Sequence, residues 1–309
     1  MVAILGPTAS GKTALAARLA YEICGEVISA DSRQVYRRMD IGTGKDLGDY
    51  MVEGTVVPHH LIDIAEPGYE YNIYEYQRDF LDAYRMITGI GRIPVLCGGS
   101  GMYLEAVLKG YRLTKAEEDH ALSDVLRDKT DAELVSMLMS CKTLHNTTDL
   151  EDRPRILKAI LVARAQDDNG YTGASRGAAG DKPPFPAIRS VIFGVAFPRD
   201  LVMRRITERL ENRLETGMIG EVEALLAEGI PPARLIRYGL EYRYITLFLQ
   251  GKLSRSEMFF SLNIAIRQFA KRQMTWFRRM ERRGMKINWL DGNLPDVKKI
   301  EMIRNFAGI

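Results

Sequence analysis

The stretch GPTASGKT at residues 6–13 has the form G-x-x-x-x-G-K-[ST] of a phosphate-binding loop. The apolar run Met1 to Leu5 predicts a buried strand before it, and Thr13 to Ile23 predicts a helix after it, because its apolar residues recur four apart. Glycines let successive backbone N–H groups turn toward a phosphate, and the positive end of the following helix attracts an anion. Lys12 would add a charge on the phosphate oxygens, and the Thr13 hydroxyl would hold Mg²⁺. We therefore expect a di- or triphosphate to be bound by Gly6, Thr8, Ala9, Ser10, Gly11, Lys12 and Thr13.

The first 112 residues predict an α/β fold around this loop. Short apolar runs alternate there with amphipathic stretches, as in βα units with a parallel sheet. The same patterns return near the end of the chain. Strands are expected at residues 26–30, 61–64, 93–97, 190–196 and 286–290, and helices at 73–87, 201–226 and 258–283.

Between these regions the pattern changes. Residues 114–165 read as charged helices, best defined at 131–139 and 155–165, and residues 169–186 read as a loop rich in glycine and proline. We therefore expect a P-loop-containing parallel sheet core flanked by helices, made of residues 1–112 and 187–309. A mainly helical insertion domain would occupy residues 113–186.

The composition is that of a globular protein and excludes several other classes. Hydrophobic residues make up 46% and charged residues 27%, which excludes wholesale disorder, and no run of 18 apolar residues predicts a membrane helix. Cys24, Cys97 and Cys141 form no C-x-x-C pair, and the four histidines lack the spacing of a zinc site. The net charge of +3 does not by itself imply nucleic acid. The N-terminal residues lack the pattern of a signal peptide, so we expect a cytoplasmic protein, with a monomer as the default.

Asp31 stands just past the strand expected at residues 26–30. Ligands of open α/β sheets bind at the carboxyl ends of strands, so its carboxylate would face the phosphate loop. There it would be a metal ligand or a general base, or it would only cap a helix. Ser32, Arg33 and Gln34 follow it and supply a hydroxyl, a guanidinium and an amide, which suit base or phosphate contacts.

Together with the phosphate loop, four further blocks resemble the tRNA dimethylallyltransferase (tRNA isopentenyltransferase) family. They read ISADSRQVYRRMDIGTGK at 28–45, PHHLIDI at 58–64, VLCGGSGMYLEAVLKG at 95–110 and AIRQFAKRQMTWFR at 265–278. The blocks lie in the family's order and cover both ends of the chain. Kinases with the same phosphate loop lack them.

The resemblance implies that the phosphate loop holds the diphosphate of dimethylallyl diphosphate. The dimethylallyl group would move to N6 of the adenine on the 3′ side of the anticodon, with Mg²⁺ as cofactor. Asp31 would be the general base that takes the N6 proton, and Ser100 would position the reactants. Arg205 and Arg209, four residues apart on one helix face, would clamp the diphosphate.

The resemblance also implies a tRNA anticodon stem-loop as partner, and the basic C-terminal helix agrees with it. Cations with an interleaved tryptophan suit a single-stranded RNA loop. Together with a basic pair in the insertion, the expected tRNA contacts are Ser32, Arg33, Gln34, Arg155, Lys158, Lys271, Arg272, Gln273, Trp276 and Arg278.

Some positions depart from the family's pattern. Asp152 and Lys158 replace an asparagine and an arginine, Tyr238-Gly239-Leu240 replaces a Gly-Tyr-Lys sequence, and Gly44-Lys45-Asp46 stands where Ala-Lys-Pro is usual. These positions concern the acceptor more than the donor. Three alternatives stay open: an isopentenyltransferase acting on free adenine nucleotides, a P-loop small-molecule kinase, and a non-catalytic RNA-binding paralogue. A GTPase is disfavoured, because no N-K-x-D motif is present.

Overall fold

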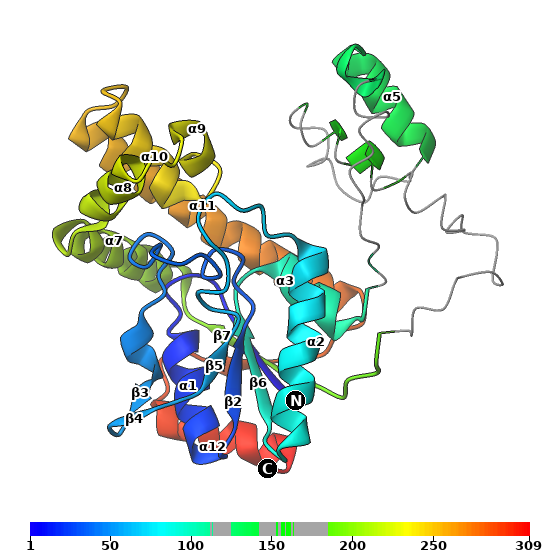
Figure 1. Ribbon diagram of the computed structural model, residues 1–309. Coiled ribbons are helices and arrows are strands. Elements are labelled where there is room, and N and C mark those ends of the chain that lie inside the picture. Colours follow the sequence, from blue (N-terminus) through cyan, green and yellow to red (C-terminus); the bar gives the residue numbers. More distant parts are fainter. Residues whose placement is uncertain are drawn as a thin grey trace. The chain divides into compact units, whose positions relative to one another are not determined.

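The computed structural model describes residues 1–111, 113, 125–141, 153, 156–157, 159–161, 163 and 185–309. A six-stranded sheet forms from β1 (Val2–Leu5), β2 (Glu26–Ser29), β5 (His59–His60), β6 (Pro94–Gly98), β7 (Val191–Ala196) and β8 (Ile287–Asp291). Its order is β5-β2-β6-β1-β7-β8, and every neighbouring pair is parallel (Figure 1). The predicted α/β class with a parallel sheet is therefore confirmed, and the strand that enters the phosphate loop lies in its interior.

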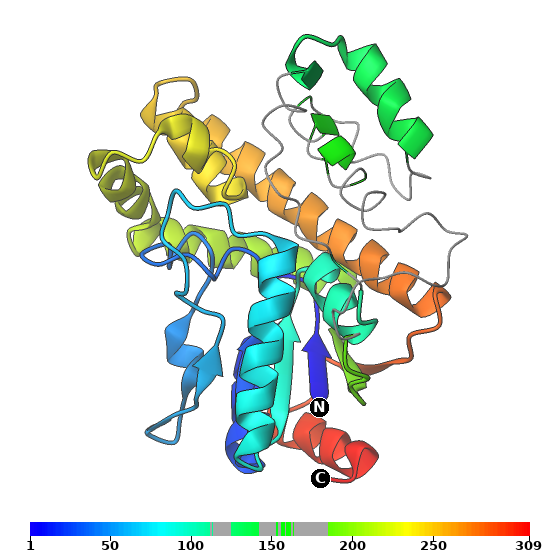
Figure 2. The same ribbon diagram turned by 45° about the vertical axis from the view of Figure 1, so that its right-hand side comes forward.

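Two groups of helices surround this sheet. The helices that pack on it are α1 (Lys12–Glu22), α2 (Ile73–Gly89), α3 (Gly101–Leu108) and α12 (Asp296–Ala307). The others form a helical layer made of α7 (Arg199–Glu215), α8 (Met218–Ala227), α9 (Pro232–Leu235), α10 (Leu240–Leu249) and α11 (Arg255–Arg282). Both views show this layer gathered beyond the carboxyl ends of the strands (Figures 1 and 2). A short helix, η1 (Leu47–Tyr50), and a hairpin of β3 (Met51–Val52) and β4 (Thr55–Val56) complete this part.

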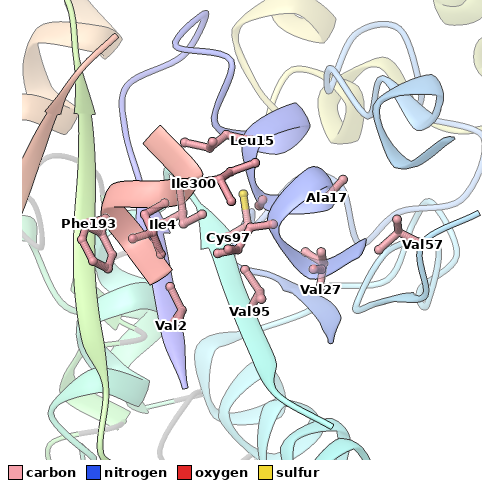
Figure 3. Close-up of a cluster of buried hydrophobic side chains, with 14 of the residues drawn as sticks. Val2, Ile4, Leu15, Ala17, Val27, Val57, Val95, Cys97, Phe193 and Ile300 are labelled. Atoms are coloured by element: carbon pink, nitrogen blue, oxygen red, sulfur yellow. The ribbon is translucent and has the colours of Figure 1, made fainter. Parts of the chain in front are cut away.

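The core lies between one face of the sheet and helices α1 and α12 (Figure 3). Alternate strand residues such as Val2 and Ile4 face it, because side chains of a strand point to opposite faces in turn. Leu15 of α1 and Ile300 of α12 close it from the other side and are almost wholly buried. This packing fixes α1, and with it the end of the phosphate loop, against the sheet.

A second apolar cluster holds the helical layer together. Ile206 of α7, Val222 of α8, Ile245 of α10 and Leu262 of α11 are buried in it. Tyr36 and other residues of the segment after β2 belong to the same cluster. The layer is thus anchored to the chain segment that follows Asp31.

Two predicted elements were wrong in detail. Residues 61–64 do not form a strand, because Leu61 and Asp63 adopt left-handed φ angles of 64° and 55°; the strand there is β5 instead. The helix expected at 201–226 is interrupted at Gly217, whose φ of 106° suits glycine and separates α7 from α8. In the described part of the chain, no helix combines the length and apolar character needed to cross a bilayer.

The chain divides into two compact units, one made of residues 1–110 and 187–309 and one of residues 111–186. In the second unit the expected helix at 131–139 is observed as α5 (Asp131–Cys141). Leu126, Leu134 and Ile160 share a small apolar cluster there. Parts of the helix expected at 155–165 and most of the loop expected at 169–186 lie outside the described residues.

Candidate active site

Three loops meet at the carboxyl edge of the sheet, because they follow adjacent parallel strands. The phosphate loop follows β1, Asp31 follows β2, and Ser100 follows β6. The Ser100 N–H donates to the carbonyl oxygen of Ala30 at 3.2 Å. The Ser32 N–H donates to the Ser100 hydroxyl oxygen at 3.0 Å. The loops after β2 and β6 are therefore bonded directly to each other.

The phosphate loop has the conformation of an anion cradle. Ala9 and Gly11 adopt left-handed φ angles of 61° and 70°, and α1 begins directly after them at Lys12. The Ser10 hydroxyl is buried and has no hydrogen-bond partner among the residues that the structure describes. Since an unpartnered buried hydroxyl is costly, this oxygen fits a cradle whose hydrogen bonds a phosphate completes.

Lys12 supplies the positive charge of this cradle. Its Nζ donates to the Pro7 carbonyl oxygen at 3.4 Å. Burial lowers the pKa of Lys12, while the nearby Cys97 and Asp31 act in the opposite direction. Burial also raises the pKa of the Cys97 thiol to about 12, so this cysteine stays neutral and packs beneath the loop. Lys12 and Asp31 are therefore close enough for their charges to interact.

Asp31 starts a turn and no helix, so the expectation that it only caps a helix was wrong. One carboxylate oxygen, Oδ1, accepts the Arg33 N–H at 2.9 Å. Among the described residues none donates to Oδ2. The carboxylate is thus oriented through one oxygen, and the other is available to a substrate. Ser32 and Arg33 are half-buried beside it.

The arginines of α7 line the other side of the phosphate loop. Arg209 Nη1 donates to the Thr8 hydroxyl oxygen at 3.4 Å. Arg205 has its guanidinium carbon 4.6 Å from the ring centroid of Phe197, and its Nη2 reaches the neighbourhood of Gly11. The i,i+4 spacing therefore places both side chains beside the loop, as expected from one helix face.

Arg213 and Asp46 complete this group, and the sequence reasoning missed both. Asp46 accepts from Arg209 at 2.7 Å and from Arg213 at 3.0 Å. Burial acts to raise the pKa of Asp46, but the two guanidiniums together hold it below its usual value. The sequence could have indicated Arg213, because it follows Arg209 by the same four residues that separate Arg209 from Arg205.

The segment that carries Asp46 is itself firmly held. Glu221 of α8 accepts the N–H groups of Asp40, Ile41 and Gly42 at 2.8, 2.7 and 3.0 Å. Lys45 is fully buried, where it pairs with Asp40 at 2.5 Å and also pairs with Asp63. Asp46 is therefore fixed in place next to the arginines.

A narrow pocket, partly open to solvent, lies between the phosphate loop and α7. Its lining is mostly apolar with three charged groups, and consists of Thr8, Ala9, Ile206, Arg209, Leu210, Arg213, Met218, Glu241 and Ile266. Burial raises the pKa of Glu241, while Arg213 and Arg209 oppose this. The sequence singled out the segment around Glu241 only as a departure from the family's pattern.

The two glutamines expected to contact tRNA have protein partners instead. Gln34 is buried, accepts from the Ser29 hydroxyl at 3.2 Å and donates to the Gly44 carbonyl oxygen at 3.0 Å. Gln273 is buried as well, and both ends of its amide are bonded to site loops. Neither side chain lies on the exposed face where a nucleic-acid contact was expected.

On α11 the expected tRNA contacts divide into two groups. Lys271, Arg272 and Arg278 are exposed. Trp276 packs instead against Gly101 at the start of α3, and the guanidinium of Arg279 covers its ring at 3.8 Å from the centroid. The indole is therefore half-buried and supports the turn at Ser100. Arg155 and Lys158 lie outside the described residues.

Thr13, the second residue of α1, is the residue that would hold Mg²⁺. In the parts of the chain that the structure describes, no three His, Cys, Asp or Glu side chains are grouped as metal ligands. Such a site suits a Mg²⁺ ion held largely by the oxygens of a bound diphosphate.

Comparison with protein families and with curated proteins gives concordant matches. The model for IPP transferase matches residues 34–280, and the model for isopentenyl transferase matches residues 1–56. The tRNA dimethylallyltransferase 2 of Phocaeicola vulgatus is 54% identical over 305 residues, which cover 99% of this chain and 96% of that protein.

Solved structures of the same kind match over the whole chain. The tRNA isopentenylpyrophosphate transferase of Bacillus halodurans is 32% identical with a TM-score of 0.70, over 99% of this chain and 95% of that one. The tRNA delta(2)-isopentenylpyrophosphate transferase of Staphylococcus epidermidis is 25% identical with a TM-score of 0.68, over 99% and 98%. The similarity thus includes both the phosphate loop and α11.

Proposed function

Because this chain belongs to the IPP transferase family of tRNA dimethylallyltransferases, we propose that it transfers the dimethylallyl group from dimethylallyl diphosphate to tRNA. The acceptor atom is N6 of the adenine on the 3′ side of the anticodon, and diphosphate is released. The observation that carries this proposal is the meeting of the phosphate loop, Asp31 and Ser100 at one edge of the sheet. This arrangement supports a diphosphate cradle beside an oriented carboxylate.

In the reaction the bond between C1 of the dimethylallyl group and the diphosphate oxygen breaks, and a bond from C1 to N6 forms. Charge develops on the leaving diphosphate, and positive groups already in place stabilise it without reorganisation. Lys12, Arg205 and Arg209 supply that charge, together with the N–H groups of the loop. Bound Mg²⁺, held at Thr13, would neutralise further charge on the same oxygens.

Asp31 takes the proton that N6 loses. An exocyclic amine is a weak nucleophile, so its attack needs a positioned base and close alignment with C1. The hydrogen bond from Arg33 to Oδ1 orients the carboxylate toward the acceptor. Ser100, bonded to the Ser32 N–H, holds the two loops in this relation.

The exposed cations of α11 provide the acceptor surface for the anticodon stem-loop. Lys271, Arg272 and Arg278 are accessible to phosphates, and this attraction is independent of base sequence. We include Arg155 and Lys158 in the same proposal from the sequence alone. We also propose a monomeric, cytoplasmic protein, as the sequence led us to expect.

The test is a transfer assay with labelled dimethylallyl diphosphate, Mg²⁺ and three acceptors. They are a tRNA with the target adenine, the same tRNA with that adenine replaced, and free AMP, with products identified by mass. Label on the first tRNA alone supports the proposal. Label on AMP would indicate an enzyme of free nucleotides, and phosphoryl transfer in place of prenyl transfer would indicate a kinase.

Lys271→Ala is expected to weaken tRNA binding and to lower the salt dependence of that binding by about one unit of log Kd per log salt. The reason is that the substitution removes one phosphate-neutralising charge. Binding of a labelled anticodon stem-loop between low and moderate salt measures both quantities. An exposed lysine on another element, Lys298 on α12, provides the control variant Lys298→Ala. Equal salt slopes for Lys271→Ala and the unmodified protein would contradict the proposal.

Diphosphate binding is expected to weaken as the pH rises into the alkaline range. Burial lowers the pKa of Lys12, so this side chain loses its charge at a lower pH than an exposed lysine does. Calorimetric titration of inorganic diphosphate across this range measures the effect. Lys12→Arg keeps its charge over the same pH range. The affinity of this variant for inorganic diphosphate should therefore stay close to its value at neutral pH. If the diphosphate affinity of both proteins falls alike as the pH rises, a group other than Lys12 is responsible.

A further inference from the structure

Gln273 joins the two loops on which the proposed donor site depends. Its Oε1 accepts the backbone N–H of Thr8 in the phosphate loop at 2.8 Å. Its Nε2 donates to the carbonyl oxygen of Gly99, just before Ser100, at 2.9 Å. The side chain is only 6% exposed, so water does not compete for either hydrogen bond. One amide therefore sets the spacing between the phosphate loop and the turn after β6.

The backbone around this amide leaves little room for adjustment. A Cβ at Gly99 would lie 2.5 Å from Nε2 of Gln273 and 3.2 Å from the Gly6 carbonyl oxygen. Glycine at position 99 is thus required for the close approach of α11, the phosphate loop and the β6 turn. The Thr8 N–H donates to Gln273, and the Thr8 hydroxyl oxygen accepts from Arg209, so this residue contacts both α11 and α7.

The helix that carries Gln273 is attached to the same turn at further points. Trp276, almost one helical turn later, packs on Gly101, and Arg279 donates to Glu105 of α3 at 3.0 Å. The exposed cations Lys271 and Arg272 lie immediately before Gln273 on this helix. The same short stretch of α11 therefore contacts the donor loop and carries the cations of the acceptor-binding face, so it fixes the position of one relative to the other.

We propose that Gln273 is a positioning residue that aligns the bound diphosphate with Asp31 and the acceptor adenine, and that it does not itself contact tRNA. This proposal rests on the proposed function, because it concerns the same site. A small displacement between the reacting atoms is enough to cost a large part of the rate. Loss of Gln273 should therefore lower kcat and alter the environment of a bound diphosphate, while tRNA binding stays the same.

The first experiment uses Gln273→Met, which keeps the length of the side chain and removes both hydrogen bonds. We expect kcat for transfer to fall by about tenfold to a hundredfold. The KM for tRNA and the Kd of an isolated anticodon stem-loop should stay within about twofold. The matched control is Gln77→Met on α2, a buried glutamine that donates to Ala106 at 3.0 Å, away from the phosphate loop. The control should leave kcat unchanged.

A second readout does not depend on transfer activity. The ³¹P resonances of bound inorganic diphosphate should shift in Gln273→Met and not in Gln77→Met. Gln273→Glu serves if the methionine variant does not fold, since it can still accept from Thr8 but cannot donate to Gly99. It should show the same ³¹P shift and a lower kcat. If the unmodified protein binds diphosphate but transfers no label, the proposed function fails, while the ³¹P comparison still tests Gln273.

Two results would overturn the proposal. One is weaker tRNA binding by Gln273→Met with kcat unchanged at saturating tRNA, which would make Gln273 an RNA contact. The other is an unshifted ³¹P spectrum together with a loss of activity equal to that of Gln77→Met, which would reduce Gln273 to an ordinary buried residue.

Discussion

Asp31→Asn is expected to lower kcat for prenyl transfer by about 10²–10⁴-fold, the range that a general base contributes. Asparagine has the same shape and can still accept the Arg33 N–H through its side-chain oxygen, so the turn after β2 should keep its conformation. What it cannot do is take a proton from N6. Donor binding and tRNA binding should therefore stay close to those of the unmodified protein. The measurement is single-turnover transfer with enzyme in excess over tRNA.

The control for this variant is Asp82→Asn, on the exposed face of α2, whose carboxylate pairs with Arg85 at 3.8 Å. It should transfer at the normal rate. A rate for Asp31→Asn within threefold of that control would remove Asp31 from the role of base. Loss of diphosphate binding in Asp31→Asn would instead indicate a metal-binding role for the carboxylate.

Lys12→Met is expected to lower kcat by about 10²–10³-fold, comparable to the loss of one preorganised donor at a developing anion. Methionine fills much of the same space beside Pro7, but the departing diphosphate loses a charge that acts from a partly buried position. Because that charge also attracts the diphosphate before reaction, the affinity for inorganic diphosphate should fall as well. Transfer kinetics and calorimetry measure the two effects separately.

The comparison is Lys252→Met, which removes an exposed charge from the turn between α10 and α11. Lys252→Met should change neither kcat nor the affinity for inorganic diphosphate. Diphosphate binding that persists unchanged in Lys12→Met would place the diphosphate elsewhere than in the phosphate loop.

The sequence predicted those parts of the site whose partners lie nearby in the chain. The phosphate loop and Asp31 are local signals, because a strand, a tight turn and a helix follow one another within a few residues. Arg205 and Arg209 were expected from the family resemblance, and their i,i+4 spacing accounts for their lying on one face of α7. The parallel sheet was also predictable, since strands and helices alternate.

Features that depend on distant partners were not predictable. Gln34 and Gln273 have the polarity expected of nucleic-acid contacts, but their hydrogen-bond partners come from other elements and bury them. Nothing in the sequence around Asp46 marks it as a site residue, because the two guanidiniums that pair with it come from α7. Residues 61–64 look like a strand by composition, but left-handed angles at Leu61 and Asp63 divert the chain. Local pattern does not encode such long-range pairings.

The place of β1 in the sheet has a consequence for the order in which the protein matures during synthesis. β1 precedes both of its partner strands in the chain, since Val2 pairs with Val95 on one side and with Val191 on the other. One edge of this strand therefore stays unpaired until β7 has been made, and contacts so distant in sequence form slowly. The Thr8 N–H gains its hydrogen-bond partner later still, once Gln273 has been made. A nascent chain thus carries the phosphate-loop motif long before Gln273 has been made, and only then can the donor site form completely.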